Sequence, residues 1–208
     1  DKKVLAVYKP YFISNEYVLN ASPGEYFLKV EGYGFPVVEK EIKNTNSLKM
    51  AEVVHMLSEL THGDAVVVTD VGQHQMVTSR YYKYKNPRTN ITSGGAGTMG
   101  FALPAAMGAK VAAPHQQVIA IIGDGGYQMT IQELGTIMQY KIPVKILVLN
   151  NNFLGMVRQW QQLFHGKRYS FTEMDNPDFV KIAEAYRIQA DKVTKQVDLE
   201  NALKKMLA

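Results

Sequence analysis

The sequence predicts an α/β fold, a mostly parallel sheet flanked by helices, and two observations support this prediction. Three short runs are almost entirely apolar, as strands buried on both faces are: 65–69, 118–122 and 144–149. Segments with apolar residues at helical spacing lie before, between and after these runs. Strands that alternate with helices in this way form a parallel sheet that is covered on both sides.

The first part of the chain, residues 1–46, differs from the rest and is expected to be a leader or linker. It is rich in Tyr and Phe and carries turn signals at 22–24 and 32–34. We therefore interpret 1–46 as irregular or partly β. The regular pattern that follows defines a main domain at 47–208.

Three features mark helices in the first two thirds of that domain. Ser47 is a suitable N-cap for a helix, because apolar residues recur at helical spacing behind it. Small residues predict a second helix around 105–111, after a glycine-rich stretch. Thr130 and Glu133 match a capping box, which predicts that a third helix starts at Thr130.

Two further helices are predicted near the end of the chain. Pro177 fits the first turn of the earlier one, because proline is favoured at that position. The later helix is expected to begin near Asp198 and to run to the end of the chain.

Composition excludes several classes of function. The net charge of +4 is spread along the chain without a basic block, so nucleic acid is not an expected partner. There is no cysteine, which removes disulfides and thiolate metal sites. No segment approaches the ~18 apolar residues of a membrane span, and the N-terminal residues lack a signal-peptide pattern. We expect no membrane partner and a cytoplasmic location.

Polar clusters follow each of the three apolar runs, at 70–75, 123–126 and 150–152. In parallel sheets, ligands bind outside the carboxyl ends of the strands, which is where these clusters should meet. Carboxylate, amide and carbonyl oxygens suit magnesium and do not suit zinc. Glycines beside an acid also let phosphate oxygens approach backbone amides. Each cluster alone would more simply be a turn or a cap, but together they favour a clamp for magnesium and a diphosphate.

A competing motif is Gly95-Ala-Gly97-Thr-Met-Gly100, which satisfies the G-x-G-x-x-G fingerprint of dinucleotide-binding folds. That fingerprint requires an apolar strand immediately before it, and 86–93 is not an apolar strand. A nicotinamide dinucleotide is therefore a weaker interpretation than the magnesium-diphosphate clamp.

Four longer motifs resemble a known family. Gly123-Asp-Gly125 and, after 24 intervening residues, Asn150-Asn151 are similar to the GDG…NN motif of thiamine-diphosphate enzymes. VGQHQM, TSGGAGTMGFALPAAMGA, GDGGYQMTIQEL and LNNNFLGMVRQWQQLFHGKRYS appear in order and resemble the large, catalytic subunit of acetohydroxyacid synthase, also called acetolactate synthase. The resemblance implies the thiamine-diphosphate-binding fold. It identifies 47–208 as the C-terminal, diphosphate-binding domain, truncated at its C-terminus, and makes 1–46 the tail of a preceding middle domain or a linker.

The resemblance implies a metal and diphosphate site. The Asp124 carboxylate, the Asn151 side chain and the Phe153 backbone carbonyl would hold magnesium. Five residues would surround the diphosphate: Gly72, Gln73, His74, Gly125 and Gly126.

It also implies contacts with the rest of the cofactor and with the substrate. Gly97 and Met99 would meet the aminopyrimidine ring through backbone groups. Met156, Val157 and Trp160 would line the substrate cavity, and Trp160 would select the second keto acid. From position alone, His74 could instead be a surface histidine and Trp160 could be core packing.

The activity implied is acetolactate synthase activity in branched-chain amino-acid biosynthesis. Pyruvate would lose carbon dioxide on thiamine diphosphate and then join a second 2-keto acid, pyruvate or 2-ketobutyrate. The parent enzyme would be a homodimer or tetramer with its active site at the subunit interface, and a regulatory small subunit is a further expected partner. FAD would bind the parent's middle domain and not this domain. The catalytic glutamate would come from a pyrimidine-binding domain outside this chain, so we expect the chain alone to be inactive.

Two alternatives remain beside this interpretation. Another thiamine-diphosphate enzyme, of the pyruvate oxidase or decarboxylase type, would share the GDG…NN motif, although the GMVRQWQ segment argues against it. A non-catalytic module that kept the fold is the second alternative, and the intact Asp124 and Asn151 argue against that.

Overall fold

The computed structural model describes residues 4–8, 16–22, 25–31 and 48–208. The chain divides into two compact units, Asp1–Asn44 and Thr45–Ala208. This division lies two residues before the boundary expected at 46/47. The turn signals at 23–24 and 32–34 and the N-cap expected at Ser47 lie outside the described residues.

The first unit contains a three-stranded antiparallel sheet in the order β1-β2-β3. Its strands are β1 (Val4–Tyr8), β2 (Glu16–Ser22) and β3 (Glu25–Glu31). Ser22 pairs with Glu25, so β2 and β3 are joined as a hairpin. The leader therefore contains strands, in line with its partly β interpretation.

The second unit is built on a four-stranded sheet in the order β5-β4-β6-β7, and every neighbouring pair is parallel. The strands are β4 (Val66–Thr69), β5 (Asn90–Thr92), β6 (Val118–Gly123) and β7 (Lys145–Leu149). All residues of β4 and β6 are buried, as their uninterrupted apolar runs predict. The predicted parallel α/β architecture is confirmed.

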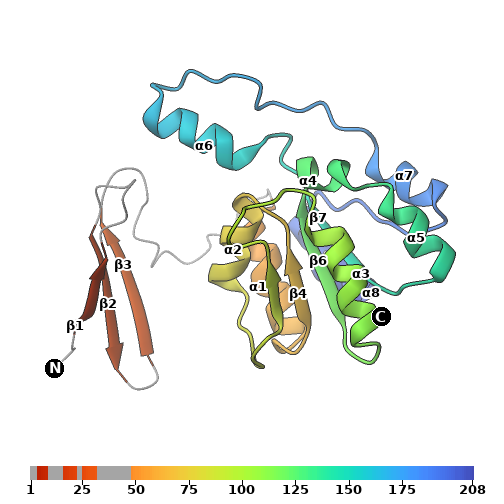
Figure 1. Cartoon of the computed structure of the whole chain (residues 1–208), viewed down its shortest axis with the longest axis horizontal. Helices are drawn as coiled ribbons and strands as arrows, with labels where there is room; N and C mark the ends of the chain where they lie inside the picture. Colours follow the sequence, from red (N-terminus) through yellow and green to blue (C-terminus); the bar gives the residue numbers. More distant parts are fainter. Residues whose placement is uncertain (1–3, 9–15, 23–24, 32–47) are drawn as a thin grey trace. The chain divides into compact units, whose positions relative to one another are not determined.

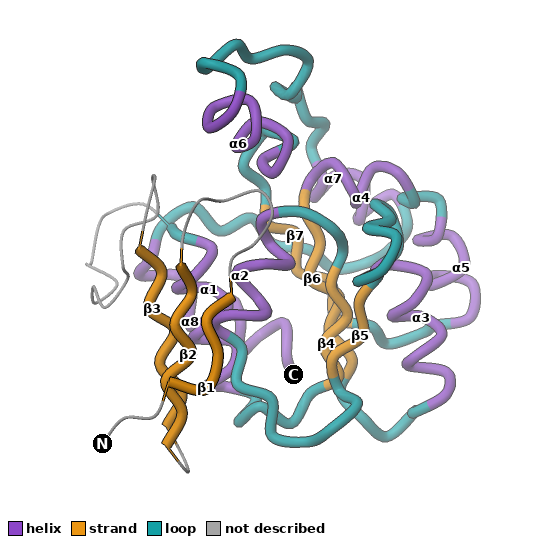
Figure 2. Tube along the Cα trace, turned by 60° about the vertical axis from the view of Figure 1, so that its left-hand side comes forward, coloured by secondary structure: helices purple, strands orange, loops and turns teal. Residues whose placement is uncertain are grey.

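Helices cover both faces of this sheet (Figures 1 and 2). The helices of this unit are α1 (Met50–Leu60), α2 (Gln73–Tyr81), α3 (Ala102–Ala112), α4 (Asp124–Met129), α5 (Glu133–Tyr140), α6 (Gly155–Phe164), α7 (Phe179–Ala185) and α8 (Gln196–Leu207), and α6 is the one that does not cover the sheet. Within the described residues, no helix has both the length and the apolar character needed to cross a membrane.

Alternate residues of the strands feed two separate hydrophobic clusters. Val66 and Val68 of β4 face the cluster formed with α3 and α5, whereas Val67 faces the cluster formed with α1 and α8. β6 divides its side chains in the same way. This alternation is the two-residue period of a strand, and it fixes the sheet between two layers of helices.

The strand order reverses between β4 and β6. The chain runs from β4 outward to β5, then returns past β4 to β6 and continues to β7. The carboxyl ends of β4, β6 and β7 therefore open on one edge around a topological switch point, where open α/β sheets bind their ligands.

The capping box predicted at Thr130 is wrong. β6 leads directly into α4 at Asp124, and Thr130 is the residue that ends this short helix. The Thr130 hydroxyl donates to the Gly100 carbonyl at 3.1 Å, so a tertiary contact uses the group that the capping box would need. The glycine-flanked acid therefore begins a helix and is not a turn before one.

Two other predicted helix starts shift by two residues. α7 begins at Phe179 rather than at Pro177, because the Asp178 carboxylate caps it by accepting from the backbone N–H groups of Val180 and Lys181. α8 begins at Gln196, before the predicted Asp198.

The sequence did not predict β5, which lies just before the glycine-rich stretch. It is three residues long, sits at the edge of the sheet and exposes Asn90 and Thr92. It does not provide the buried apolar strand that a dinucleotide fingerprint requires. Pro104 lies in the first turn of α3, where proline is tolerated.

Candidate functional site

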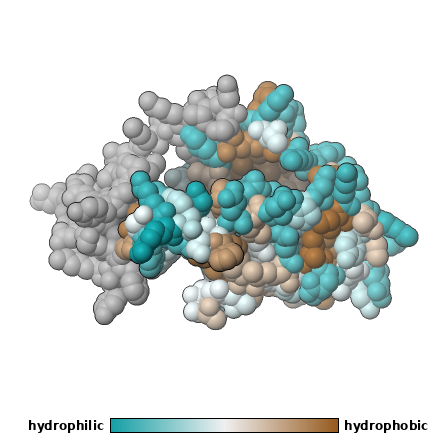
Figure 3. Space-filling view, turned by 90° about the horizontal axis from the view of Figure 1, so that it is seen from above, coloured by the Kyte–Doolittle hydropathy of each residue, from teal (hydrophilic) through white to brown (hydrophobic). Residues whose placement is uncertain are grey.

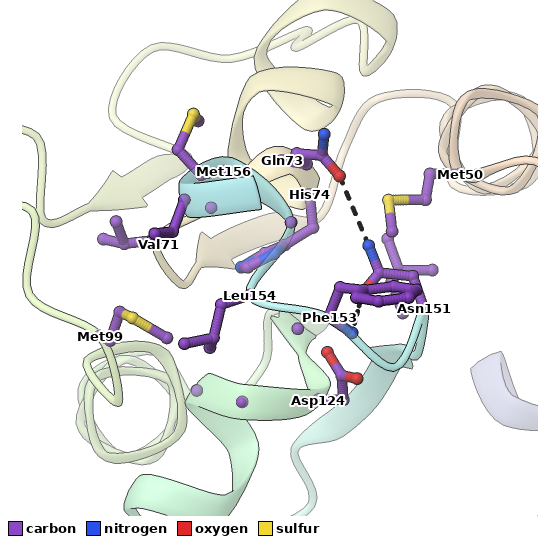
Figure 4. A pocket seen from close by; sticks show the side chains of 17 residues that line it. Met50, Val71, Gln73, His74, Met99, Asp124, Asn151, Phe153, Leu154 and Met156 are labelled. Carbon is purple, nitrogen blue, oxygen red and sulfur yellow. Dashed lines mark hydrogen bonds between the residues drawn. The ribbon is translucent and has the colours of Figure 1, made fainter. Parts of the chain in front are cut away.

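One cavity lies at the carboxyl edge of the sheet, and the segments at the ends of three strands supply most of its lining (Figure 4). The turn after β4 and the start of α2 contribute residues 71–74, and the end of β6 with the start of α4 contributes 123–126. The segment from the end of β7 into α6 contributes 149–157, apart from Asn150 and Asn152. Met50 and Met99 complete it. The three polar clusters singled out in the sequence therefore meet at one place.

This cavity brings together all but two of the site residues that the resemblance implies. The lining includes the expected metal ligands Asp124, Asn151 and Phe153, together with the following expected contacts: Gly72, Gln73, His74, Met99, Gly125, Gly126, Met156 and Val157. Gly97 and Trp160 are not part of it. Gly97 has a left-handed φ of 62° and donates its N–H to Ser93.

Asp124 is placed by the strand register. Gly123 pairs with Leu149 across β6 and β7, so Asp124 and the asparagines after β7 emerge beside each other. Asp124 is only 2% exposed, and its Oδ2 accepts from Asn176 Nδ2 at 2.7 Å. A buried carboxylate beside an open cavity is well placed to bind a cation.

The Asn151 amide is held from two sides. Its Oδ1 accepts from the Phe153 backbone N–H at 3.1 Å, and its Nδ2 points to Gln73 Oε1 at 3.4 Å. Gln73 Nε2 in turn donates to Gln159 Oε1 of α6 at 2.9 Å. Figure 4 shows Asn151, Phe153 and Asp124 on the same side of the cavity.

A second carboxylate, Asp70, lies at the end of β4 and has a structural role. It is fully buried, and its oxygens accept from the backbone N–H groups of Val71 at 2.8 Å, Gly100 at 3.1 Å and Ala102 at 3.0 Å. These bonds hold the loop that carries Met99. A Cβ at Gly126 would lie 2.5 Å from Asp70 Oδ1, so only glycine fits there.

His74 is 5% exposed, so it is not the surface histidine that its position alone allowed. Burial lowers its pKa from 6.5, against the opposing effect of the Asp70 and Asp124 carboxylates and of a hydrogen bond to the Asp70 backbone. Its Nε2 is buried without a hydrogen-bond partner in the described part of the chain. Such an atom is costly unless a ligand satisfies it.

α6 stands apart from the layers that cover the sheet (Figures 1 and 2). It has no buried residue, and Trp160 is 41% exposed with its ring 5.1 Å from that of Phe164, so the core-packing alternative for Trp160 is wrong. The Arg158 guanidinium lies 4.2 Å from the centre of the Phe153 ring and 4.0 Å from that of Tyr169.

Hydrophobic patches interrupt the hydrophilic surface of the described residues in the view from above (Figure 3).

Sequence reasoning missed several residues at this site. Leu154 lies beside Gly125, where a Cβ would lie 2.8 Å from Leu154 Cδ2. Gln159 reaches Gln73, and Asn176 reaches Asp124 from 52 positions along the chain. The only signal for Asn176 was its place before Pro177-Asp178, which indicates a helix start and nothing more.

Comparisons with known proteins agree with this geometry. The family model described as the thiamine pyrophosphate enzyme, C-terminal TPP binding domain, matches residues 70–208. The acetolactate synthase large subunit of Lactococcus lactis is 49% identical over 160 residues, which cover 76% of this chain and 28% of that protein. The acetolactate synthase isozyme 3 large subunit of Escherichia coli is 47% identical over 165 residues, or 79% of this chain and 29% of that protein.

A solved structure is also similar. The thiamine diphosphate-dependent 4-hydroxybenzoylformate decarboxylase of Rhodococcus jostii superposes with a TM-score of 0.74 at 28% identity, over 86% of this chain and 33% of that one. The chain thus spans less than a third of the length of the curated relatives it matches. It belongs to the family of C-terminal thiamine pyrophosphate-binding domains of thiamine pyrophosphate enzymes.

Proposed function

We propose that this chain holds the diphosphate of thiamine diphosphate through a magnesium ion, as the cofactor-binding part of an acetolactate synthase. The observation that carries the proposal is the meeting of Asp124, Asn151 and Phe153 in one cavity at the switch point of the sheet.

The donor set fits magnesium. It offers one carboxylate, one amide oxygen and one backbone carbonyl, all hard ligands, and a magnesium ion with few protein ligands completes its shell with phosphate oxygens and water. Among the described residues, no three side chains of the types His, Asp and Glu come together as they would in a metal site built from those residues alone. Asp124, Asn151 and the Phe153 carbonyl would hold the ion.

The cavity also fits a diphosphate. His74 brings a buried Nε2 that has no partner in the described part of the chain, and a diphosphate oxygen would accept a hydrogen bond from it in the tautomer that carries the proton on Nε2. A Cβ at Gly155 would collide with Gln73 Oε1 and lie 2.9 Å from Asn151 Nδ2, so only glycine fits at this position. Gly72, Gln73, Gly125 and Gly126 would complete the surroundings.

Thiamine diphosphate, when bound, supplies the electron sink that lets a 2-keto acid lose carbon dioxide. The chain's contribution is to position that group and to exclude water, with Met99, Leu154, Met156 and Val157 as apolar lining. Only His74 and Asp124 among the lining residues can ionise, and no glutamate faces the cavity in the described part of the chain. We therefore propose that the base that starts proton transfer comes from another domain.

The relatives' names suggest the activity of the whole protein. At 47–49% identity they are acetolactate synthase large subunits. We therefore propose pyruvate and 2-ketobutyrate as substrates, branched-chain amino-acid biosynthesis as the pathway, and a cytoplasmic homodimer or tetramer that binds FAD outside this domain. Trp160 would select the second keto acid, and a regulatory small subunit is a further proposed partner.

Calorimetry tests the cofactor site. Thiamine diphosphate with Mg²⁺ should release or absorb measurable heat with the wild-type chain and none with Asp124→Ala, because that variant loses the only carboxylate in the proposed metal site. Binding should be weak, since roughly half of the cofactor's contacts lie elsewhere and each 1.4 kcal/mol lost weakens affinity tenfold. Equal heats for the two proteins would contradict the assignment of Asp124 as a metal ligand.

An activity assay tests the predicted inactivity of the isolated chain. Formation of acetolactate from pyruvate by this chain would refute that prediction.

A decarboxylase is the second candidate, favoured by the structural similarity to a benzoylformate-type decarboxylase. The identity to that protein is 28%, well below that to the synthases. The product decides between them: the complete enzyme should form acetolactate from pyruvate, whereas a decarboxylase would release an aldehyde.

A further inference from the structure

We propose that Asn176 is a positioning residue that holds the Asp124 carboxylate ready for the metal ion. This inference rests on the magnesium site proposed above and goes beyond it, since Asn176 belongs neither to the expected ligands nor to the residues that line the cavity. Asn176 comes from the segment between α6 and α7, far from the strand ends in the sequence.

The Asn176 amide joins the ends of two neighbouring strands. Its Nδ2 lies 2.7 Å from Asp124 Oδ2, which follows β6, and 3.0 Å from Asn150 Oδ1 and from Asn152 Oδ1, which follow β7. An amide nitrogen carries two hydrogens, so three oxygens share them. The shortest of these bonds is the one to the carboxylate, as expected for a charged acceptor.

Gln128 fixes which way the Asn176 amide faces. Gln128 Nε2 donates to Asn176 Oδ1 at 2.8 Å, and it also lies 3.4 Å from the Asp124 carbonyl oxygen. Because the Asn176 oxygen is used by Gln128, its nitrogen is the end that meets Asp124. Asp124 and Gln128 both belong to α4, so Asn176 bridges two positions on that helix.

The segment that carries Asn176 is itself pinned to the proposed metal loop. Leu154 donates its N–H to the Thr172 carbonyl at 2.8 Å, and Met174 donates to the Asn152 carbonyl at 2.9 Å. Phe153 and Glu173 form an antiparallel bridge between these bonds. Asn176 therefore reaches Asp124 from backbone that is hydrogen-bonded to the loop holding Asn151 and Phe153.

This arrangement gives each of the three consecutive asparagines a distinct role. Asn151 lines the cavity (Figure 4). The side chains of Asn150 and Asn152 instead accept hydrogen bonds from Asn176. The bond from Asn176 engages Oδ2 of Asp124 and leaves Oδ1 for the cation. Groups that orient a metal ligand in this way typically change metal affinity by ~10- to 100-fold when removed.

The test compares two neighbouring variants of the 208-residue chain. Asn176→Ala removes the bond to Asp124, and Asp178→Ala removes the cap of α7 two residues away without touching Asp124. Mn²⁺ is the probe, with thiamine diphosphate present, and paramagnetic resonance reports the free ion. Asn176→Ala should weaken Mn²⁺ binding by ~10- to 100-fold. Asp178→Ala should lower the melting temperature and leave Mn²⁺ affinity unchanged.

The outcomes separate this inference from the function on which it rests. Wild-type affinity in Asn176→Ala, with the wild-type chain binding Mn²⁺, would overturn the inference and leave the metal site standing. No diphosphate-dependent Mn²⁺ binding by the wild-type chain would overturn both. If Asn176→Ala does not fold, Gln128→Met provides the test, because it frees the Asn176 amide to turn. A weaker but measurable loss of Mn²⁺ affinity is expected there, and unchanged affinity would refute the positioning role.

Discussion

Asp70 and Asp124 occupy equivalent places and are used in opposite ways. Each follows a fully buried strand at the same edge of the sheet, and they are 0% and 2% exposed. The Asp70 carboxylate accepts hydrogen bonds from three backbone N–H groups. The Asp124 carboxylate accepts a hydrogen bond from one side-chain amide, that of Asn176, and it lines the cavity. A buried acid whose oxygens are satisfied by backbone is part of the scaffold, and one that is only partly satisfied can bind a ligand.

The largest expected effect comes from removing the scaffold acid. Asp70→Ala leaves three N–H groups without their acceptor, at ~1–3 kcal/mol each, so the free energy of unfolding should fall by roughly 3–5 kcal/mol. Asp124→Ala should cost less than about 1.5 kcal/mol, because within the described part of the chain a single side-chain amide donates to it. Urea unfolding of both variants measures the difference, and equal losses would contradict the division of roles.

A smaller effect should follow from crowding Asp70 rather than deleting it. Gly126→Ala would place a Cβ 2.5 Å from Asp70 Oδ1, so we expect a loss of about 1–3 kcal/mol. Gly125→Ala is the matched control on the same helix, since its Cβ meets the end of the flexible Leu154 side chain. Gly125→Ala should therefore be nearly neutral in thermal melts. The comparison fails if Gly126→Ala is tolerated as well as Gly125→Ala.

The smallest effect is a pH dependence from His74, which lies between the two acids. Burial lowers its folded pKa below 6.5, while the unfolded chain takes up a proton as the pH falls through 6.5. The unfolded state then binds more protons, so His74 should make the chain less stable as the pH drops below 6.5, with no effect above it. His74→Gln should show a shallower decline in melting temperature between neutral and mildly acidic pH. Parallel declines would show that other groups cause it.

The strand ends could be predicted from sequence because the information is local. The apolar runs at 118–122 and 144–149 place Asp124 and Asn151 at the same edge once the sheet is taken as parallel, and β6 and β7 do pair in that way. The buried state of β4 and β6 follows from the same runs.

What escaped prediction depends on contacts between distant segments. Thr130 has the spacing of a capping residue, but its hydroxyl is taken by Gly100. Asn176 looks like part of a helix start, yet its amide reaches Asp124. Asp70 and Asp124 both follow an apolar run in the sequence, and the bonds from the backbone N–H groups of distant Gly100 and Ala102 give Asp70 its different role. Sequence spacing does not show which partner a polar side chain meets across the fold.

A crystal structure of the chain with Mg²⁺ and thiamine diphosphate would test the central claim most directly. The account predicts one ion at ~2.1 Å from an Asp124 carboxylate oxygen, from Asn151 Oδ1 and from the Phe153 carbonyl, with diphosphate oxygens completing its shell. An ion bound elsewhere, or a diphosphate held at this edge without Asp124 and Asn151 sharing a cation, would contradict it.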